Sequence, residues 1–194
     1  MEVLQRLEDL DRSKTYSYLD YLTWHFQERV ELIKGKIFTM SPAPGRRHQQ
    51  ISVELSRQFA NFLLNHRCEV YEAPFDIRLP RIDENEIYTV VQPDLVVICD
   101  QSKLDDAGCL GAPDLIVEIL SKSTLHKDLK DKFELYEESG VLEYWIISPN
   151  DEVVDVFVLD KDSYHLVGKY TVQDEVQSLT LKGLSVDLST VFRT

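Results

Sequence analysis

The sequence predicts a single α/β domain in which helices flank a mixed central sheet and an antiparallel meander lies at the C-terminal end. Its 194 residues fit one domain. A helical pattern over residues 124–139 stands between two strand-like runs, 115–120 and 143–147, and this order favours a mixed sheet. Further strand-like runs at 153–159 and 164–170 follow at short intervals, which favours antiparallel pairing.

The composition is typical of a soluble globular protein. With 43% hydrophobic and 28% charged residues, the chain belongs neither to the disordered nor to the fibrous class. No apolar run approaches the ~18 residues that span a bilayer. The N-terminus is charged where a secretory signal would be apolar. We therefore expect a cytoplasmic protein with no membrane partner.

The three cysteines carry no recognisable pattern. Cys68, Cys99 and Cys109 are odd in number, far apart and without CxxC spacing. This arrangement predicts neither a disulfide framework nor a zinc ribbon. We expect three buried, small apolar side chains.

The charge is strongly negative but unevenly distributed. A formal net charge of −13 argues against indiscriminate nucleic-acid binding. Residues 29–67, however, contain seven Lys or Arg against two acids. Such a segment is compatible with a face that meets an anionic partner, and equally with a solvated helix face.

The first half of the chain predicts two helices and a hairpin. A capping-box pattern predicts a short helix over about 18–27. The runs 30–33 and 36–40 predict a hairpin with glycine at its turn. After a proline-rich loop at 41–45, the apolar spacing predicts a long amphipathic helix over 46–67.

The middle of the chain predicts three strands and one exposed loop. The strand-like runs are 68–71, 75–79 and 94–99. Residues 80–88 between the last two runs are acidic and poor in apolar side chains, which indicates an exposed loop.

Glu118 interrupts the apolar run 115–120. A carboxylate in a buried strand must be neutralised, be paired or hold a cation. A structural pair with Lys or Arg is one interpretation. The other is a functional site, where such strain concentrates, and we treat Glu118 as a candidate site residue.

Asp94 is the natural partner of Glu118, because it begins the strand-like run 94–99 directly after Pro93. If the two strands are neighbours, both carboxylates reach one point, and such an oxygen site suits Mg²⁺ or Mn²⁺. Asp114 belongs to a second Pro-Asp pair but would lie ~13 Å from Glu118 on the same strand, at ~3.3 Å per residue. We expect Asp114 to start or cap the strand instead.

Asp128, Lys132 and Tyr136 recur every four residues on the helix over 124–139 and so share one face. An Asp–Lys pair at this spacing is usually a surface salt bridge of little weight. Because this helix follows the strand of Glu118, Lys132 would also be placed to position a water or to stabilise developing phosphate charge.

Six ordered motifs cover nearly the whole chain. They are Glu31-Leu-Ile-Lys-Gly35, Ser41-Pro-x-Pro with His48, Gln92-Pro-Asp-Leu-Val-Val97, Gly111-Ala-Pro-Asp-Leu-Ile-Val-Glu-Ile-Leu-Ser121, Ser123-Thr124 with Asp128, Lys132 and Tyr136, and Glu143-Tyr-Trp-Ile-Ile-Ser-Pro149. In these motifs the chain resembles the Uma2 family, formerly a domain of unknown function abundant in cyanobacteria. The resemblance extends over about 15–190, and we take 1–194 as one Uma2-like domain.

The Uma2 family is similar to the PD-(D/E)XK nuclease superfamily, which implies a restriction-endonuclease-like fold and metal-dependent phosphodiester hydrolysis. By this resemblance Asp94 is the acid of the PD motif and Glu118 is the second acid. Glu31 is implied as a third ligand of the Mg²⁺ or Mn²⁺ ion.

The lysine departs from the superfamily pattern. It would stand two residues after Glu118, where this chain has Leu120. Lys132 matches the family pattern and is the predicted catalytic lysine, with Lys122 as the alternative.

Two functions are compatible with these residues. The first is a Mg²⁺- or Mn²⁺-dependent endonuclease acting on nucleic acid, with DNA as the expected partner. Its phosphate contacts would be Arg46, Arg47, His48 and Lys122, although His48 fits a plain helix-surface position equally well. The second is a catalytically inactive nuclease fold that serves as a binding or assembly module, which the charge of −13 and the displaced lysine favour.

A homodimer is also expected, partly because related nucleases cut two strands with two subunits. Aromatic residues in the last third of the chain provide material for an apolar interface, unless they belong to the core. They are Tyr144, Trp145, Phe157, Tyr164 and Tyr170.

Overall fold

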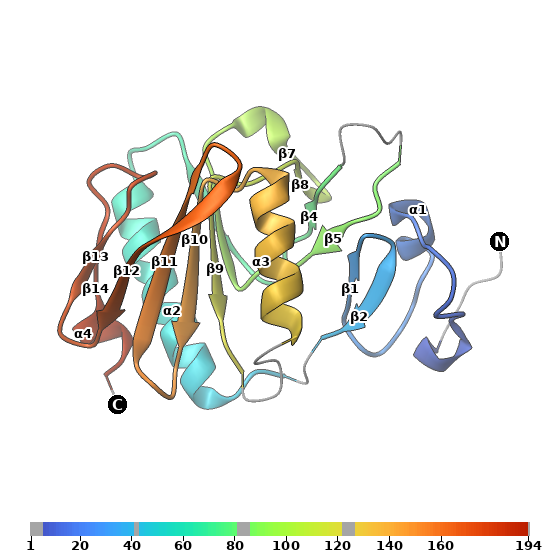
Figure 1. Ribbon diagram of the computed structural model, residues 1–194, viewed down its shortest axis with the longest axis horizontal. Coiled ribbons are helices and arrows are strands. Elements are labelled where there is room, and N and C mark those ends of the chain that lie inside the picture. The colour runs from blue at the N-terminus through green and yellow to red at the C-terminus, as the bar shows by residue number, and fades with distance from the viewer. Residues whose placement is uncertain (1–5, 41–42, 81–85, 122–126, 194) are drawn as a thin grey trace.

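The computed structural model describes residues 6–40, 43–80, 86–121 and 127–193, and within these residues the strands form two larger sheets and one small one. Two long helices lie on opposite faces of the central sheet (Figure 1). Among the described helices none is long and apolar enough to cross a membrane.

The central sheet has six strands and is mixed, as predicted. Its order is β12 (Ser163–Thr171), β11 (Val153–Asp160), β10 (Glu143–Ser148), β9 (Leu115–Ile119), β6 (Leu95–Ile98) and β3 (Glu69–Glu72). β9 and β10 are parallel, because the helix between them returns the chain to the same end of the sheet, and the other neighbours are antiparallel. The predicted meander is confirmed in β10, β11 and β12.

A second six-stranded sheet lies beside α3, and the sequence did not predict it. Its order is β2 (Lys36–Thr39), β1 (Val30–Ile33), β5 (Val90–Val91), β4 (Ile77–Arg78), β8 (Gly108–Leu110) and β7 (Leu104–Asp105). The predicted hairpin forms its β1–β2 edge, and Gly35 at the turn has φ of 75°. The third sheet pairs β13 (Glu175–Gln177) with β14 (Ser185–Asp187).

The two long helices are α2 (Arg46–Leu63) and α3 (Lys127–Ser139). α2 buries one apolar stripe, and its members are Ile51, Leu55, Phe59 and Leu63. The stripe packs against Leu115, Val117 and Ile119 of β9. Because side chains alternate along a strand, Ile116 and Glu118 face the opposite side, where α3 lies.

The short helices are α1 (Tyr18–Tyr21), α4 (Leu188–Val191), η1 (Leu7–Asp9) and η2 (Gln101–Lys103). The capping box of Ser17 and Asp20 is confirmed at the start of α1. The helix nevertheless ends at Tyr21 and not near residue 27, and Trp24 beyond it packs edge-on against Tyr16 and Tyr21.

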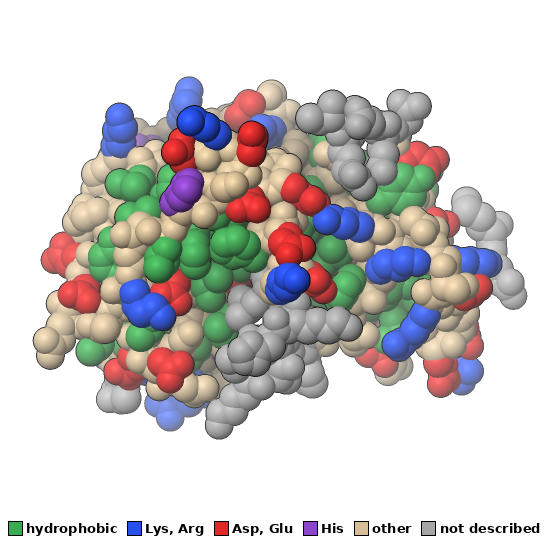
Figure 2. Space-filling model, in the orientation of Figure 1, with side chains coloured by type: hydrophobic (Ala, Val, Ile, Leu, Met, Phe, Trp, Pro, Cys, Tyr) green, Lys and Arg blue, Asp and Glu red, His purple; other side chains and the backbone are tan. Residues whose placement is uncertain are grey.

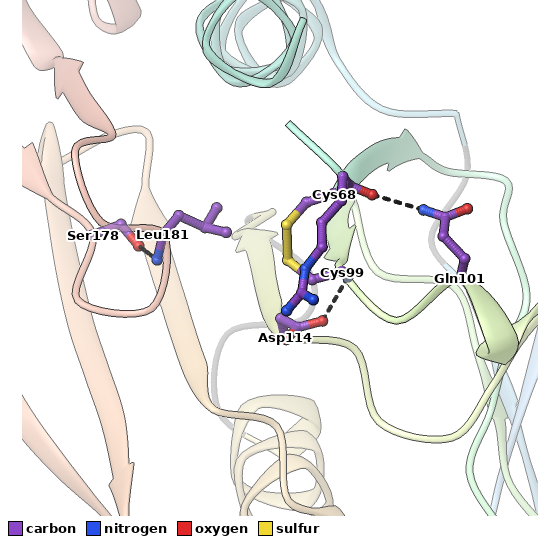
Figure 3. The surroundings of a disulfide bond; sticks show 7 residues. Cys68, Cys99, Gln101, Asp114, Ser178 and Leu181 are labelled. Atoms are coloured by element: carbon purple, nitrogen blue, oxygen red, sulfur yellow. Dashed lines mark hydrogen bonds between the residues drawn. A yellow bond between two sulfur atoms is a disulfide. The ribbon is translucent and has the colours of Figure 1, made fainter. Parts of the chain in front are cut away.

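Cys68 and Cys99 form a disulfide, so the expectation of three unpaired cysteines is wrong for these two (Figure 3). β3 pairs antiparallel with β6 in a register that opposes Glu69 to Ile98, which brings Cys68 and Cys99, one residue further out on each strand, face to face. Cys109 is free and buried, as expected.

Asp114 lies beside the disulfide at the start of β9. Its Oδ2 accepts a hydrogen bond of 2.8 Å from the backbone N–H of Cys99. The expected role of Asp114 at the start of the strand is therefore confirmed.

The aromatic residues of the last third lie mostly in the core. Tyr144 and Trp145 are fully buried, and Tyr164 is nearly so. The surface argument for a homodimer is therefore wrong for these residues. On the face seen in Figure 2, apolar side chains gather left of centre over the meander, and the Lys and Arg side chains are scattered among acidic ones.

Candidate functional site

A cavity of about 350 Å³ lies where the two larger sheets and the first turn of α2 meet. Its polar lining comes from separate parts of the chain and includes Arg29, Glu31, His48, Gln92, Asp94, Glu118, Ser121, Lys132 and Tyr144. Its apolar lining includes Ile33, Phe38, Met40, Pro44, Ile119 and Leu120. Five predicted site residues, Glu31, His48, Asp94, Glu118 and Lys132, thus line one cavity.

Lys132 links two of the acids. Its Nζ lies 2.9 Å from Oε1 of Glu31 and 2.9 Å from Oε1 of Glu118. These side chains are only 13%, 7% and 12% exposed, respectively. Tyr136, one helical turn after Lys132, donates a hydrogen bond of 2.7 Å to the same oxygen of Glu118. The helix α3 therefore compensates the buried carboxylate of β9.

Glu31 is held from the other side by the segment that precedes Asp94. The backbone N–H of Gln92 donates to Oε1 of Glu31 over 2.8 Å. The side chain of Gln92 is fixed in turn, because its Nε2 donates to Asp76 over 2.6 Å and its Oε1 accepts from Arg29. Gln92 thus fixes the orientation of an acid of the site through its backbone.

Asp94 stands beside the end of β9. β6 and β9 are adjacent, as predicted, and they are antiparallel. Oδ2 of Asp94 accepts a hydrogen bond of 2.7 Å from the backbone N–H of Ile119, the residue after Glu118. Oδ1 lies 3.3 Å from Nε2 of His48 in the first turn of α2. Asp94 and Glu118 therefore lie on neighbouring strands at the same level of the sheet.

The cluster holds three carboxylates and one buried ammonium group, and this imbalance governs its pKa values. Burial, with the charges of Asp94 and Glu31, raises the pKa of Glu118 to about 7, although Lys132 acts against the shift. Burial alone would lower the pKa of Lys132, but the charges of Glu118 and Glu31 raise it above 10.5. Lys132 therefore stays protonated at neutral pH.

Burial and the neighbouring charges also shift the pKa of His48 in opposite directions. Burial lowers its pKa, but the hydrogen bond to Asp94 and the charges of Asp94 and Glu118 outweigh burial, so the pKa lies above 6.5. An additional proton on His48 would offset part of the negative charge.

The other predicted phosphate contacts are not brought to this cavity. Arg47 donates to Glu152 over 2.8 Å and to the backbone carbonyl of Phe192 over 2.7 Å, which fixes the C-terminal segment. Arg46 is exposed at the first position of α2 and does not line the cavity. Lys122 lies outside the described residues.

Four residues of the site were not assigned to it from the sequence. Tyr136 had a signal in its helical spacing from Lys132, and Gln92 had one in its place before Pro-Asp. Arg29 was counted only as part of the basic segment. Tyr144 had no signal, because a tyrosine in an apolar strand is usually a core residue.

The comparisons with known proteins identify the family of this chain. Residues 18–189 match the family model Uma2, which carries the description "Putative restriction endonuclease". This chain belongs to the Uma2 family.

Two relatives come from Synechocystis sp., and both are described as uncharacterized proteins. This Uma2 chain is 30% identical to slr1290 over 177 residues, which are 90% of either chain. It is 29% identical to sll1609 over 143 residues, which are 73% of this chain and 74% of the relative.

A crystal structure of a "putative nuclease belonging to DUF820" from Anabaena variabilis has the same fold as this Uma2 chain. It superposes with a TM-score of 0.70 at 17% identity, covering 91% of this chain and 97% of the other. The likeness confirms the fold class.

The donor chemistry of the Uma2 cavity fits a hard divalent cation. Glu31, Asp94 and Glu118 offer only oxygen ligands, as Mg²⁺ and Mn²⁺ require. Within the described residues, however, no group of three His, Cys, Asp or Glu side chains could hold a metal ion as it stands, and Lys132 lies between two of these acids. Because Mg²⁺ commonly takes one or two carboxylates and completes its shell with water or phosphate oxygens, Asp94 and Glu118 fit as a pair. Glu31 as a third ligand stays a prediction.

Proposed function

We propose that this Uma2 protein is a divalent-metal-dependent endonuclease that hydrolyses phosphodiester bonds of nucleic acid, with DNA as its substrate. The observation that carries the proposal is the cluster of Glu31, Asp94, Glu118 and Lys132 in one cavity. Membership of the Uma2 family supports the same conclusion.

In this proposal Asp94 and Glu118 hold Mg²⁺ or Mn²⁺, and Glu31 extends the site. When bound, such an ion polarises the phosphate and lowers the pKa of bound water. The raised pKa of Glu118 supports this assignment, because a carboxylate that is destabilised by two neighbouring acids gains most from an added cation.

Lys132 has the role of a charge stabiliser. The charges of Glu118 and Glu31 raise the pKa of Lys132, which favours a protonated charge stabiliser over a general base. Its ammonium group instead orients Glu31 and Glu118 and offsets negative charge that develops on the phosphate.

Arg29 and, when it is protonated, His48 supply further positive charge to the cavity. His48 lies against Asp94, and Arg29 is exposed and donates to Gln92. Arg47 is bonded to the C-terminal segment. We therefore assign the phosphate contacts to His48 and Arg29 instead.

A second candidate function is a nuclease fold without catalysis that serves as a binding or assembly module. One observation favours it: Lys132 already pairs with two of the three acids. In that case the cluster is a structural ion pair, and neither metal binding nor cleavage is expected.

Incubation of the purified protein with supercoiled plasmid and Mn²⁺ tests the proposal. We expect nicked and linear products, and Asp94→Asn should lose about a hundredfold or more of the activity, on the scale of one preorganised charge. Glu138→Gln is the matched control, because Glu138 is an exposed acid of α3 that pairs with Lys34. Parallel reactions with single-stranded DNA and with RNA identify the substrate. No cleavage under any of these conditions, or equal cleavage by Asp94→Asn, would refute the proposal.

We also propose that the protein forms a homodimer. Exposed apolar side chains on and near the meander, at Leu142, Leu166 and Val167, offer a surface in place of the buried aromatics. Light scattering at micromolar concentration should give the mass of two chains, and the mass of one chain would contradict the proposal.

A further inference from the structure

The cavity contains a buried hydroxyl group that the proposed chemistry has not yet used. Tyr144 is fully buried in β10, and its ring packs edge-on against Tyr136 and lies close to Phe133 and Tyr164. It also lines the cavity. The ring is thus fixed by neighbouring aromatics.

The Tyr144 hydroxyl has no hydrogen-bond partner among the described residues. The neighbouring hydroxyls differ: Tyr136 donates to Glu118 over 2.7 Å, and Tyr164 donates to the carbonyl of Val141 over 2.9 Å. Because a buried polar group without a partner is costly, nearly all such groups in folded proteins are paired. Because no described residue pairs with it, this hydroxyl at the cavity is available to a partner from outside the chain.

The surroundings of the hydroxyl define the chemistry of that partner. β10 runs parallel to β9 with Tyr144 beside Ile116, so Tyr144 and Glu118 lie on the same face of the sheet. Burial first, and then the charges of Glu118, Asp94 and Glu31, raise the pKa of Tyr144 well above 10. The group therefore remains a neutral hydrogen-bond donor, which suits an anionic oxygen.

We propose that the Tyr144 hydroxyl donates a hydrogen bond to a non-bridging oxygen of the phosphate group that enters this cavity. The inference rests on the proposed function and deepens it, since it assigns a substrate-contacting residue outside the acid–lysine cluster. A donor held rigid before the substrate arrives needs no reorganisation when charge develops on the phosphate.

The test compares Tyr144→Phe with Tyr164→Phe in the full-length protein. Each change removes one hydroxyl from the same aromatic cluster, but Tyr164 is bonded within the chain and does not line the cavity. Three quantities are measured: the melting temperature of the free protein, the affinity for a fluorescent DNA duplex in Ca²⁺, and the rate of duplex cleavage in Mn²⁺.

We expect Tyr144→Phe to melt no lower than the unmodified protein, because it loses no intramolecular hydrogen bond. Its affinity for the duplex or its cleavage rate should fall about tenfold or more, the range of one hydrogen bond to a charged group. Tyr164→Phe should behave in the opposite way, with a lower melting temperature and unchanged affinity and cleavage.

The outcomes separate this inference from the proposed function. If the unmodified protein cleaves the duplex and Tyr144→Phe equals it in both affinity and rate, the inference is wrong and the proposed function stands. If the protein binds the duplex without cleaving it and Tyr144→Phe binds less tightly, the phosphate contact stands and the hydrolytic function fails. If the protein binds neither the duplex nor single-stranded DNA or RNA, both are overturned.

Discussion

Replacing Lys132 by methionine tests whether the acid cluster depends on its lysine. Methionine retains most of the length and apolar character of the side chain but removes the charge. Glu31 and Glu118 then lose the ammonium group that lies 2.9 Å from each of them. At 7% and 12% side-chain exposure, water compensates little of this loss.

The expected loss of stability is about 3 kcal/mol at pH 8, at the lower end of the range for breaking a buried ion pair. Protonation of Glu118 limits the loss. Its pKa is about 7 with the lysine present, against 4.5 for an ordinary glutamate, and removing the lysine raises it further. An acid with a raised folded-state pKa destabilises the fold progressively as the pH rises above its unfolded pKa. The difference between the variant and the unmodified protein should therefore grow from pH 5.5 to pH 8.

Urea unfolding at the two pH values measures this difference. For a chain of this length, about 3 kcal/mol also corresponds to a fall in melting temperature of about 6–12 °C. The control is Lys34→Met, which breaks the exposed pair of Lys34 with Glu138 and should change stability by less than about 0.5 kcal/mol. An equal stability of Lys132→Met and the unmodified protein at pH 8, or a loss that does not depend on pH, would refute the reasoning.

Three further perturbations test other parts of the structure. Mg²⁺ should raise the melting temperature of the unmodified protein by mass action, and Glu118→Gln should abolish this rise while keeping the fold; a rise of equal size in both would exclude Glu118 as a ligand. The disulfide is removed by dithiothreitol or by replacing both Cys68 and Cys99 with serine. For a separation of 31 residues, the loop-entropy model gives a loss of stability of about 3–4 kcal/mol. An unchanged melting temperature would contradict this expectation. Hydrogen bonding to Arg57, above all, lowers the pKa of Glu54 from 4.5 to about 2. Glu54→Gln should therefore lower the free energy of unfolding by about 2 kcal/mol at pH 7, and this loss should disappear as the pH falls from 4.5 to 2. A loss that does not change with pH would show that the charge of Glu54 is not responsible.

Long, periodic segments of the fold were predictable from the sequence. β9 is an apolar run, interrupted by Glu118, that helices cover on both faces, and α2 repeats its apolar side chains at helical spacing. The second sheet was not predictable, because β4, β5 and β7 have two residues each and carry no period. These strands exist only because neighbours distant in the sequence pair with them.

A site residue was predictable from the sequence where its polarity differs from that of its neighbours. Glu118 is a charge in an apolar strand, and the resemblance to a known family directed attention to Lys132. The cysteines of the disulfide and Tyr144 do not differ from their sequence neighbours in this way. Cys68 and Cys99 become neighbours only through the pairing of β3 with β6, and Tyr144 fits its strand as an ordinary core residue. Only the three-dimensional structure shows that its hydroxyl lacks a partner among the residues that the structure describes.

The positions of the charged groups along the chain have a consequence for synthesis on the ribosome. Glu31 and Glu118 both emerge before Lys132, which is their common counter-charge on α3. A nascent chain that ends with β9 therefore carries the acids without the lysine, and closing its two sheets would bring uncompensated carboxylates together. Docking of the sheets is consequently favoured only after α3 has been made, so the order of synthesis delays the assembly of the cavity until the helix that neutralises it is present.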